Sequence, residues 1–450
     1  MKNKAFLGVC GLLVFLAFSL PGCRAEVGGG DGNGIDDTAY NAVKLVPVTP
    51  KELREAEPEY GVLSPVPGGA NDFAFRLSAA LAKQAGTENL VCSPLSVWIP
   101  LAALVNAAGD QYKAGLLTAL GIPPGLGEKD INDGVSGMLY NLTRQREKKS
   151  YEEFYKEFYG EKQEGSYREP LKIANAIFVD HDMTIKQGFA QAFMDYFLGV
   201  SINVDFESPA AAGEVNEWVK KHTNGMIPEI VKGFDTGTAA VIANAIYFFD
   251  RWDQEFDPDE TEEDVFYVPE EETSAFYMLR EGDGLIYYED ETLQALPLGF
   301  ENGSGMYILL PKDGDASGLL ASLTDGYFND IQAGSVLAQG KLLLPRFSIE
   351  GDVMSFGNIL ETLGVPLFNE GSLTGVAEGT ALQLSDVLHK AVIKVDEKGT
   401  TAAAVTVLPM ATSAGPQEPE KVFVMNCNRP FVFVLYDRRQ VLFTGMVNRP

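Results

Sequence analysis

Histidine and cysteine are scarce in this sequence of 450 residues, which has three histidines and four cysteines. They are too few and too scattered for a zinc finger, a disulfide framework or a histidine-rich metal centre, so we expect no metal and no cofactor. Positive charge is also low, because 35 Lys and Arg stand against 63 Asp and Glu, a net charge of −28. This balance argues against a nucleic-acid partner. The motifs G-x-S-x-G and H-E-x-x-H are both absent, which disfavours a secreted hydrolase.

The composition is that of a folded protein. Hydrophobic residues make up 46% of the chain and charged residues 22%, so a sizeable core can be buried. The length alone allows up to three domains.

The first 22 residues are typical of a secretory signal peptide. Lys2 and Lys4 precede an uncharged stretch from Ala5 to Leu20, which is followed by the sequence LPGC. LPGC resembles a bacterial lipoprotein lipobox, which would make Cys23 the lipid-modified first residue of the mature chain. We therefore expect a lipid-anchored protein outside the cytoplasm of a bacterium. The alternative is a protein that is simply secreted or is held by an uncleaved signal.

Residues 23–67 are rich in Gly, Pro and acidic residues, and their apolar residues keep no sustained period. This composition is typical of a flexible tether. The folded domain is expected from residue 68 to residue 450.

The folded part begins with helical patterns and ends with strand patterns. A helix is predicted over Asn71–Gln84 behind an Asn/Asp cap, and a second begins at Ser93 with Pro94 in its first turn. Later stretches are short and β-rich: 239–249, 305–311, 340–349, 391–395, 422–425, 431–437 and 441–447. This order favours an α+β fold with large, mostly antiparallel sheets.

Six segments of this part of the chain form a recognisable series. They are NLVCSPLSVWIPLAALVNAAG, NEWVKKHTNGMIPEIV, ANAIYFFDRWDQEFDPDET, LLPRFSIEG, LHKAVIKVDEKGTTAAAVT and NRPFVFVLYD with VLFTGMVNRP. Taken together, they resemble the serpin family of serine protease inhibitors, and they follow one another in the family's order. The resemblance covers Asn71 to Pro450 and implies one domain with N-terminal helices, three β-sheets and an exposed reactive-centre loop.

Residues 399–416 are all uncharged in a chain where 22% of positions carry charge. Random placement would give such a run about one time in a hundred, so the stretch is suited to burial. Its small residues, such as Thr400 and Ala402, fit between existing strands. Composition alone also fits an ordinary internal strand followed by a loop.

The family resemblance implies that this segment is a bait loop that inserts into the central sheet after a protease cuts it. Insertion of about a dozen residues would release on the order of ten kcal/mol. The hinge that inserts first would comprise Glu397, Gly399, Thr400, Thr401, Ala402, Ala403 and Ala404, which carry no bulky or charged side chain at inward positions. Such a hinge resembles those of inhibitory members.

Family spacing places the cleaved bond at Ser413–Ala414, with Met410 as a competing site. Pro409 lies in the part expected to insert, where it removes one strand hydrogen bond. These residues are uncharged, which suits elastase-, subtilisin- or chymotrypsin-like proteases better than trypsin-like ones.

The resemblance also implies two groups of residues that control insertion. Ser93, Ser96, Asn244 and His389 match a buried polar cluster beneath the sheet, called the shutter. Trp252, Arg346 and Glu397 match the breach, where insertion begins, and Arg346 with Glu397 is expected to form an exposed ion pair. Cys92 and Cys427 are expected in different strands as free, buried thiols.

The function expected from the resemblance is suicide inhibition, not catalysis. The partner would be a serine protease, captured in a covalent complex by a monomeric inhibitor anchored to the membrane through lipid. The alternative is a non-inhibitory binding or storage protein with the same fold.

Overall fold

The computed structural model describes residues 43–45, 65–143, 171–222, 225, 227–248, 250–268, 271–379, 382–400 and 422–450. Among these residues, no helix is both long enough and apolar enough to cross a lipid bilayer.

The first sheet has six strands in the order β1-β4-β3-β5-β14-β13. The neighbours β3 and β5 are antiparallel, whereas β5 and β14 are parallel. The strands are β1 (Val43–Leu45), β4 (Gly199–Val204), β3 (Leu171–Asp180), β5 (Ala240–Phe248), β14 (Asp386–His389) and β13 (Met354–Ser355).

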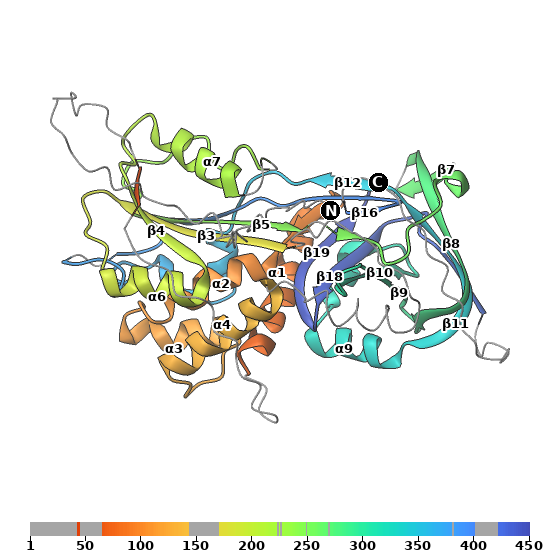
Figure 1. Cartoon of the computed structure of the whole chain (residues 1–450), viewed down its shortest axis with the longest axis horizontal. Coiled ribbons are helices and arrows are strands. Elements are labelled where there is room, and N and C mark those ends of the chain that lie inside the picture. Colours follow the sequence, from red (N-terminus) through yellow and green to blue (C-terminus); the bar gives the residue numbers. More distant parts are fainter. Residues whose placement is uncertain are drawn as a thin grey trace, which may run out of the picture. The chain divides into compact units, whose positions relative to one another are not determined.

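Helices cover both faces of this sheet (Figure 1). Because side chains alternate along a strand, Ala176 and Phe178 of β3 pack on the side of α7 (Ala211–His222), whereas Ile177 and Val179 join the main core on the other side. That other side carries α2 (Pro94–Leu104), α4 (Glu128–Thr143) and α6 (Gln187–Phe197).

A group of four strands continues this sheet beyond the end of β5 that leads into β6, in the order β12-β15-β16-β6. We call the two groups together the central sheet, and the end formed by these four strands its upper end. Three of the four strands are next in the chain to strands of the six-stranded part. Strand β6 comes directly after β5, β15 comes directly after β14, and β12 comes directly before β13. The fourth strand, β16, lies between the continuations of β5 and β14. The four strands are β12 (Phe347–Glu350), β15 (Val392–Asp396), β16 (Gly399–Thr400) and β6 (Asp250–Arg251).

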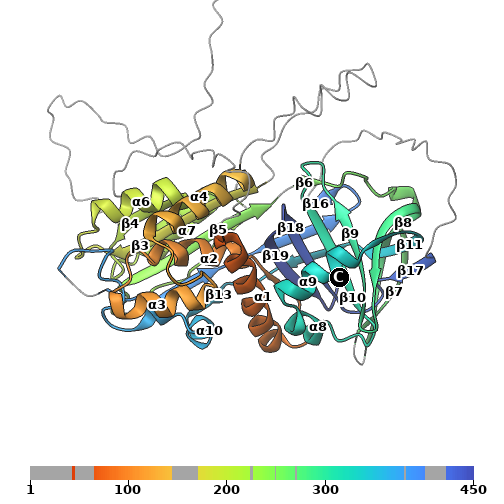
Figure 2. The same ribbon diagram turned by 90° about the horizontal axis from the view of Figure 1, so that it is seen from below.

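The largest sheet has nine strands, with β7 paired to β8 outside its main path β17-β11-β8-β9-β10-β18-β19-β2. Figure 2 shows these strands grouped at the opposite end from α3 (Asp110–Ala119) and α6. The strands are β17 (Val422–Asn426), β11 (Val336–Pro345), β8 (Glu271–Glu289), β9 (Leu293–Gly299), β10 (Gly305–Pro311), β18 (Phe431–Asp437), β19 (Gln440–Val447), β2 (Leu90–Cys92) and β7 (Glu262–Val268).

The remaining helical elements fill the space around the sheets. They are α1 (Val66–Ala85), α8 (Ala316–Ser322), α9 (Asp325–Gly334), α10 (Gly357–Thr362) and the 3-10 turns η1 (Pro258–Glu260) and η2 (Pro366–Phe368).

The α+β fold predicted from the sequence is confirmed, with differences of detail. The predicted helix at 71–84 is present, but it begins at Val66, so Asn71 does not cap it. Asn71 is instead buried, where its side-chain oxygen accepts hydrogen bonds from Gln440 and from the backbone of Val441. The predicted strand over 340–349 is two strands, because the chain turns from β11 to β12 at Arg346.

Two further segments differ from their sequence-based description. Residues 43–45, which composition assigned to a tether, form an edge strand paired with β4, because a segment of three residues is too short to show a hydrophobic period. Both predicted free thiols are buried, but only Cys92 lies in a strand, since Cys427 follows the end of β17.

Candidate functional site

The hinge residues Gly399 and Thr400 already form a strand inside the central sheet. Thr400 is paired with Val395 of β15 on one side and with Asp250 of β6 on the other. Its hydroxyl accepts a hydrogen bond from the backbone N–H of Asp250 at 3.0 Å and donates to the carbonyl of the same residue at 3.2 Å. Only 2% of Thr400 is exposed. A small side chain is therefore required at this position.

Gly399 needs to be glycine for two reasons. Its φ is +134°, a backbone conformation that side-chain-bearing residues rarely adopt. In addition, a Cβ atom on Gly399 would lie 2.3 Å from the carbonyl oxygen of Asp250. The hinge strand can fit beside β6 only because this residue has no side chain.

Below the hinge strand, β5 and β14 pair directly. Their register joins Asp386 to Val241 and His389 to Asn244. Further up, among the described residues, the only strand between β15 and β6 is the two-residue β16. The sheet is thus closed in its lower half and parted by the hinge at its upper end.

The breach residues meet at this upper end. The Arg346 guanidinium contacts Glu397 Oε1 through Nε at 2.7 Å and through Nη2 at 2.5 Å, and the Thr261 hydroxyl donates to the same oxygen at 2.7 Å. Burial by itself would raise the pKa of Glu397, but the hydrogen bonds from Arg346 and Thr261 outweigh it and lower the pKa. The expectation of an exposed pair is wrong for Glu397, which is buried beneath a partly exposed Arg346.

Trp252 ties the start of the hinge to the sheet. Its indole N–H donates to the carbonyl of Asp396 at 2.9 Å, and its backbone N–H donates to the carbonyl of Lys398 at 3.0 Å. The ring stacks on Phe300 with a centroid separation of 4.4 Å. Residues 396–398 are therefore held by both the side chain and the backbone of one buried aromatic residue.

The shutter residues lie where the closed half of the sheet ends. The backbone N–H of Ser93, at the start of α2, donates to His389 Nε2 at 3.1 Å, and Ser96 Oγ lies 3.3 Å from His389 Nδ1. Because the Ser96 hydroxyl donates to the carbonyl of Ser93, it accepts from Nδ1, which fixes a neutral imidazole with its proton on Nδ1. Complete burial lowers the pKa of His389 to about 3.

Asn244 lies opposite His389 in the register but bonds elsewhere. Its side-chain NH₂ donates to Asn175 of β3, whose own NH₂ donates to the carbonyl of Phe197 at 2.8 Å. The Asn244 side-chain oxygen is buried and has no hydrogen-bond partner among the described residues. The four predicted shutter residues are thus brought to one place, but they belong to two separate hydrogen-bonded groups. One joins the start of α2 to β14, and the other joins β5 to β3.

Several predicted residues cannot be placed. Thr401, Ala402, Ala403, Ala404, Met410, Ser413, Ala414 and Cys23 lie outside the described residues.

Sequence reasoning missed Thr261, Asn175 and Phe300. Their residue types are common in strands and loops, and only the folded chain brings them to Glu397, Asn244 and Trp252.

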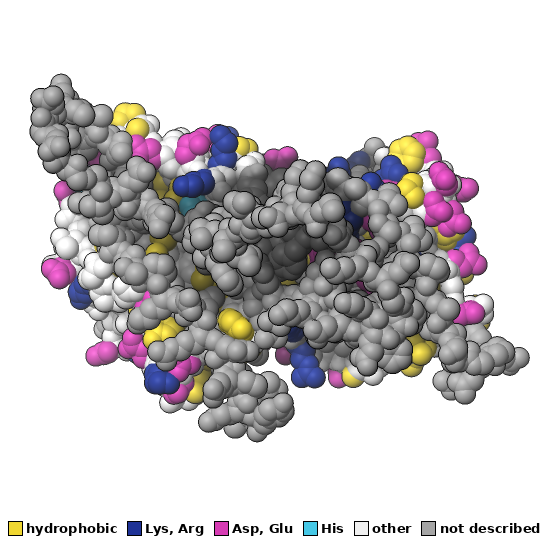
Figure 3. Space-filling view, in the orientation of Figure 1, with side chains coloured by type: hydrophobic (Ala, Val, Ile, Leu, Met, Phe, Trp, Pro, Cys, Tyr) yellow, Lys and Arg dark blue, Asp and Glu magenta, His cyan; other side chains and the backbone are white. Residues whose placement is uncertain are grey.

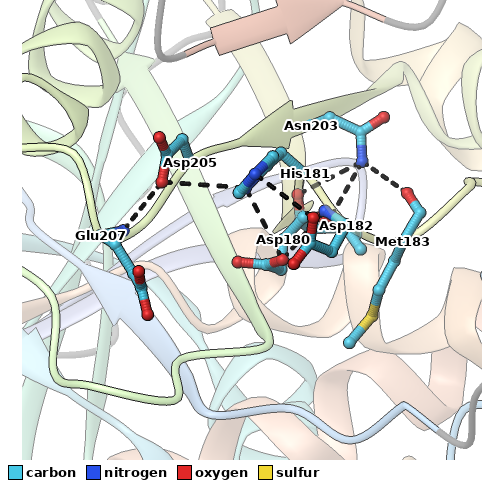
Figure 4. Close-up of polar contacts among 8 residues, drawn as sticks. Asp180, His181, Asp182, Met183, Asn203, Asp205 and Glu207 are labelled. Atoms are coloured by element: carbon cyan, nitrogen blue, oxygen red, sulfur yellow. Dashed lines mark hydrogen bonds and ion pairs between the residues drawn. The ribbon is translucent and has the colours of Figure 1, made fainter.

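A separate polar cluster closes the turn after β3 (Figure 4). His181 Nδ1 lies 3.8 Å from Asp180 and 3.8 Å from Asp205, and its Nε2 lies 3.4 Å from Asp182. Asp180 and Asp205 also accept backbone hydrogen bonds from Asp182 and Glu207. Because β3 runs antiparallel to β5, this cluster lies at the end of the sheet away from the hinge. Its contacts join the ends of β3 and β4.

The family of the chain follows from comparison with known proteins. The family model for serpins, described as serine protease inhibitors, matches residues 69–450. The chain is 28% identical to the plasma serine protease inhibitor of Bos taurus over 89% of this chain and 94% of that protein. It is 27% identical to the corticosteroid-binding globulin of Ovis aries over 84% of each chain. The crystal structure of the thermophilic serpin tengpin in its native state superposes with a TM-score of 0.73 at 24% identity, over 90% of this chain and 98% of tengpin.

The chain belongs to the serpin family. Its fold is the serpin fold, and the family is in general one of protease inhibitors that also contains binding proteins.

The buried His389 predicts a loss of stability in acid. In the unfolded chain His389 titrates at its ordinary pKa of 6.5, whereas in the fold its pKa is about 3, so the unfolded state binds the proton first. Stability is therefore complete above about pH 6.5 and falls as the pH drops toward 3. Between pH 7 and pH 5 we expect His389 to account for a loss of about 2 kcal/mol. Urea unfolding followed by tryptophan fluorescence measures it.

The matched variant is His389→Gln, which cannot titrate. Its loss of stability between pH 7 and pH 5 should be smaller than that of the wild type by the same amount. An equal loss in the two proteins would show that His389 is not the group responsible.

The geometry at Gly399 predicts that Gly399→Ala displaces the hinge strand. The Cβ clash with Asp250 should open the pairing of β16 with β6, so the backbone amides of residues 250–252 should exchange hydrogen with solvent roughly ten-fold faster or more. Hydrogen exchange with mass spectrometry measures this. The control is Gly188→Ala, at a helical position where a Cβ meets nothing within 4 Å. Unchanged exchange in Gly399→Ala would contradict the assignment.

Proposed function

We propose that this serpin is an irreversible suicide-substrate inhibitor of extracellular serine proteases. The observation that supports this most is the hinge strand, because Gly399 and Thr400 already occupy the position between β15 and β6 that the rest of the loop would take on insertion. The two residues that begin the hinge strand are thus already part of the sheet before any bond is cut.

The next step is extension of the hinge strand by Thr401 and the residues that follow it. Each added residue lengthens the pairing with β15 and β5, and each backbone hydrogen bond is worth about 0.5–1.5 kcal/mol net. The four residues from Thr401 to Ala404 are small and uncharged, so they give little resistance to burial. Fast insertion is what inhibition requires, because the acyl-enzyme must be trapped before water hydrolyses it.

The proposed sequence of events begins with attack of the protease serine on the carbonyl of Ser413, with Met410 as the competing position. The bond to Ala414 breaks, and the protease stays attached to Ser413 as an ester. Insertion of residues 401 onward then carries the attached protease along the sheet. Uncharged residues at the cleaved bond suit elastase-, subtilisin- or chymotrypsin-like proteases.

The competing function is that of a non-inhibitory binding protein, as the name of the corticosteroid-binding globulin indicates for that relative. The two functions differ in the fate of the chain after mixing with elastase, subtilisin, chymotrypsin or trypsin. An inhibitor gives a band of combined mass on a denaturing gel, and mass spectrometry of the released peptide gives the bond that was cut. Clean cleavage without such a band, at every ratio of the two proteins, would support a binding protein.

Thr400→Arg tests the insertion step. The wild-type side chain is buried between β15 and β6, and an arginine placed there would bring an unpaired charge into the sheet. We expect the covalent complex to be lost and the loop to be cleaved as a substrate, with the yield of complex falling at least ten-fold. Thr362→Arg, at an exposed position on α10, is the control and should inhibit like the wild type. Undiminished inhibition by Thr400→Arg would rule out insertion as the mechanism.

We further propose that lipid on Cys23 anchors the protein outside the cytoplasm, at a bacterial membrane. Support for this comes from the sequence LPGC at residues 20–23, after an uncharged stretch.

Cys23→Ser tests the anchor. We expect the wild type to partition into the detergent phase of a phase-separation assay and to label with a radioactive fatty acid. The variant should remain in the aqueous phase without label. Both proteins in the aqueous phase would support a secreted protein instead, and both in the detergent phase an uncleaved signal.

A further inference from the structure

The hairpin formed by β7 and β8 presents two exposed aromatic side chains. Tyr267 and Phe276 are each 49% exposed, although aromatic residues of this size are usually buried. Each lies opposite an acidic residue in the antiparallel register, Tyr267 opposite Glu272 and Phe276 opposite Glu263. We call this outer face, made by Glu263, Tyr267, Glu272 and Phe276, the hairpin face.

The opposite side of the hairpin accounts for this arrangement. Phe266, Val268, Ala275 and Tyr277 point the other way and are buried against the core. Because side chains alternate along a strand, burying these four residues forces Tyr267 and Phe276 outward. Folding therefore does not require aromatic residues at these two positions.

Within the hairpin segment itself, up to Leu279, the charged side chains are all acidic, and the basic Arg346 guanidinium lies over the Phe276 ring. Residues 253–279 contain eleven Asp and Glu and no Lys, Arg or His. Figure 3 shows acidic and hydrophobic side chains, with some Lys and Arg among them, at the end of the molecule where β7 and β8 lie in Figure 1. A surface of this kind attracts a positively charged protein, and its exposed aromatic rings offer apolar contact area once the two surfaces meet.

The hairpin also contacts both flanks of the reactive loop. At its start, Thr261 donates a hydrogen bond to Glu397, which precedes the hinge strand. Further along, the backbone N–H of Tyr267 donates at 2.8 Å to the carbonyl of Asn428, which follows β17. A protein that engages the loop is therefore brought close to the hairpin face.

Covalent reach supports the same conclusion. The bond between Ser413 and Ala414 is at most nine residues from Val422, the first residue of β17, which is roughly 30 Å of fully extended chain. A protease domain of about 230 residues is roughly 40 Å across. The cleaved bond therefore stays within one protease diameter of β17, so a bound protease is within reach of the surface beside the loop.

We propose that the hairpin face is a docking surface for the body of the target protease, and that it favours proteases with a basic surface beside the active-site cleft. The identity of the partner as a protease rests on the function proposed above. Glu263 and Glu272 would raise the rate of encounter with a basic protease, and Tyr267 and Phe276 would hold it after contact. The face would thus select among proteases of equal cleavage specificity.

One contact links this face to the breach. The Arg346 guanidinium lies 5.6 Å from the ring centroid of Phe276, and the same guanidinium pairs with Glu397. For this reason Phe276 is left unchanged in the experiment, which uses Tyr267 and the two acidic residues.

The test compares association rates. The probe is a basic elastase-type protease, used native and with its lysines succinylated, which reverses its surface charge while its cleavage specificity is checked on a small peptide. The measured quantity is the second-order rate at which the intact serpin is consumed, by complex formation or by cleavage. The variants are Glu263→Lys/Glu272→Lys and Tyr267→Ser. The control, Glu361→Lys/Glu378→Lys, makes the same change in net charge at exposed positions away from the hairpin.

At about 50 mM salt, the Glu263→Lys/Glu272→Lys variant should react on the order of ten-fold more slowly with the native protease and faster with the succinylated one. Both effects should shrink near 0.5 M salt. Tyr267→Ser should slow the reaction several-fold at both salt concentrations. The control variant should stay close to the wild type.

Rates of both hairpin variants that match the control would overturn the docking proposal. The fate of the consumed chain is a separate readout. A serpin that is only cleaved, at a rate that still depends on the hairpin face, would support docking and contradict inhibition. A covalent complex that forms at rates unchanged by the hairpin variants would support inhibition and contradict docking.

Discussion

The central sheet is the constraint on which the rest of the structure depends. Strands β5 and β14 pair for four residues, and above them their continuations are separated by the two-residue strand β16. A strand edge with unpaired backbone groups favours the addition of another strand. The inserted hinge therefore determines where the sheet opens and which segment of the chain fills the opening.

The shutter and the breach lie at the two ends of this opening. His389 and Asn244 are opposite one another at the last pair of the closed half, and Ser93 and Ser96 hold the imidazole from α2. At the upper end, Glu397 is fixed by Arg346 and Thr261 just before the chain turns into the hinge strand. Lengthening the inserted strand must separate β14 from β5, which would end the pairing of His389 with Asn244. The contacts of Glu397 with Arg346 and Thr261 can stay in place while the two strands separate.

The fold could be predicted from the sequence because its signals are local: short β-rich stretches, a buried helix that starts at Ser93 with Pro94, and segments whose order matches a known family. The positions of Ser93, Ser96 and His389 also followed from motif matching. The inserted state of Gly399 and Thr400 could not be predicted, because small uncharged residues fit an exposed loop and a buried strand equally well. Pairing with Asp250 and Arg251, about 150 residues earlier in the chain, decides between them. The burial of Glu397 and the role of Thr261 depend on similar long-range contacts.

The central claim is that the intact chain is held in a state of higher free energy than the same chain with its loop cut and inserted. The most direct measurement is the thermal unfolding midpoint of the purified protein before and after a single cut in residues 401–421 by a protease that forms no complex. The account predicts that the midpoint rises by roughly 10 °C or more after the cut, because strand insertion adds on the order of ten kcal/mol. An unchanged midpoint would contradict it.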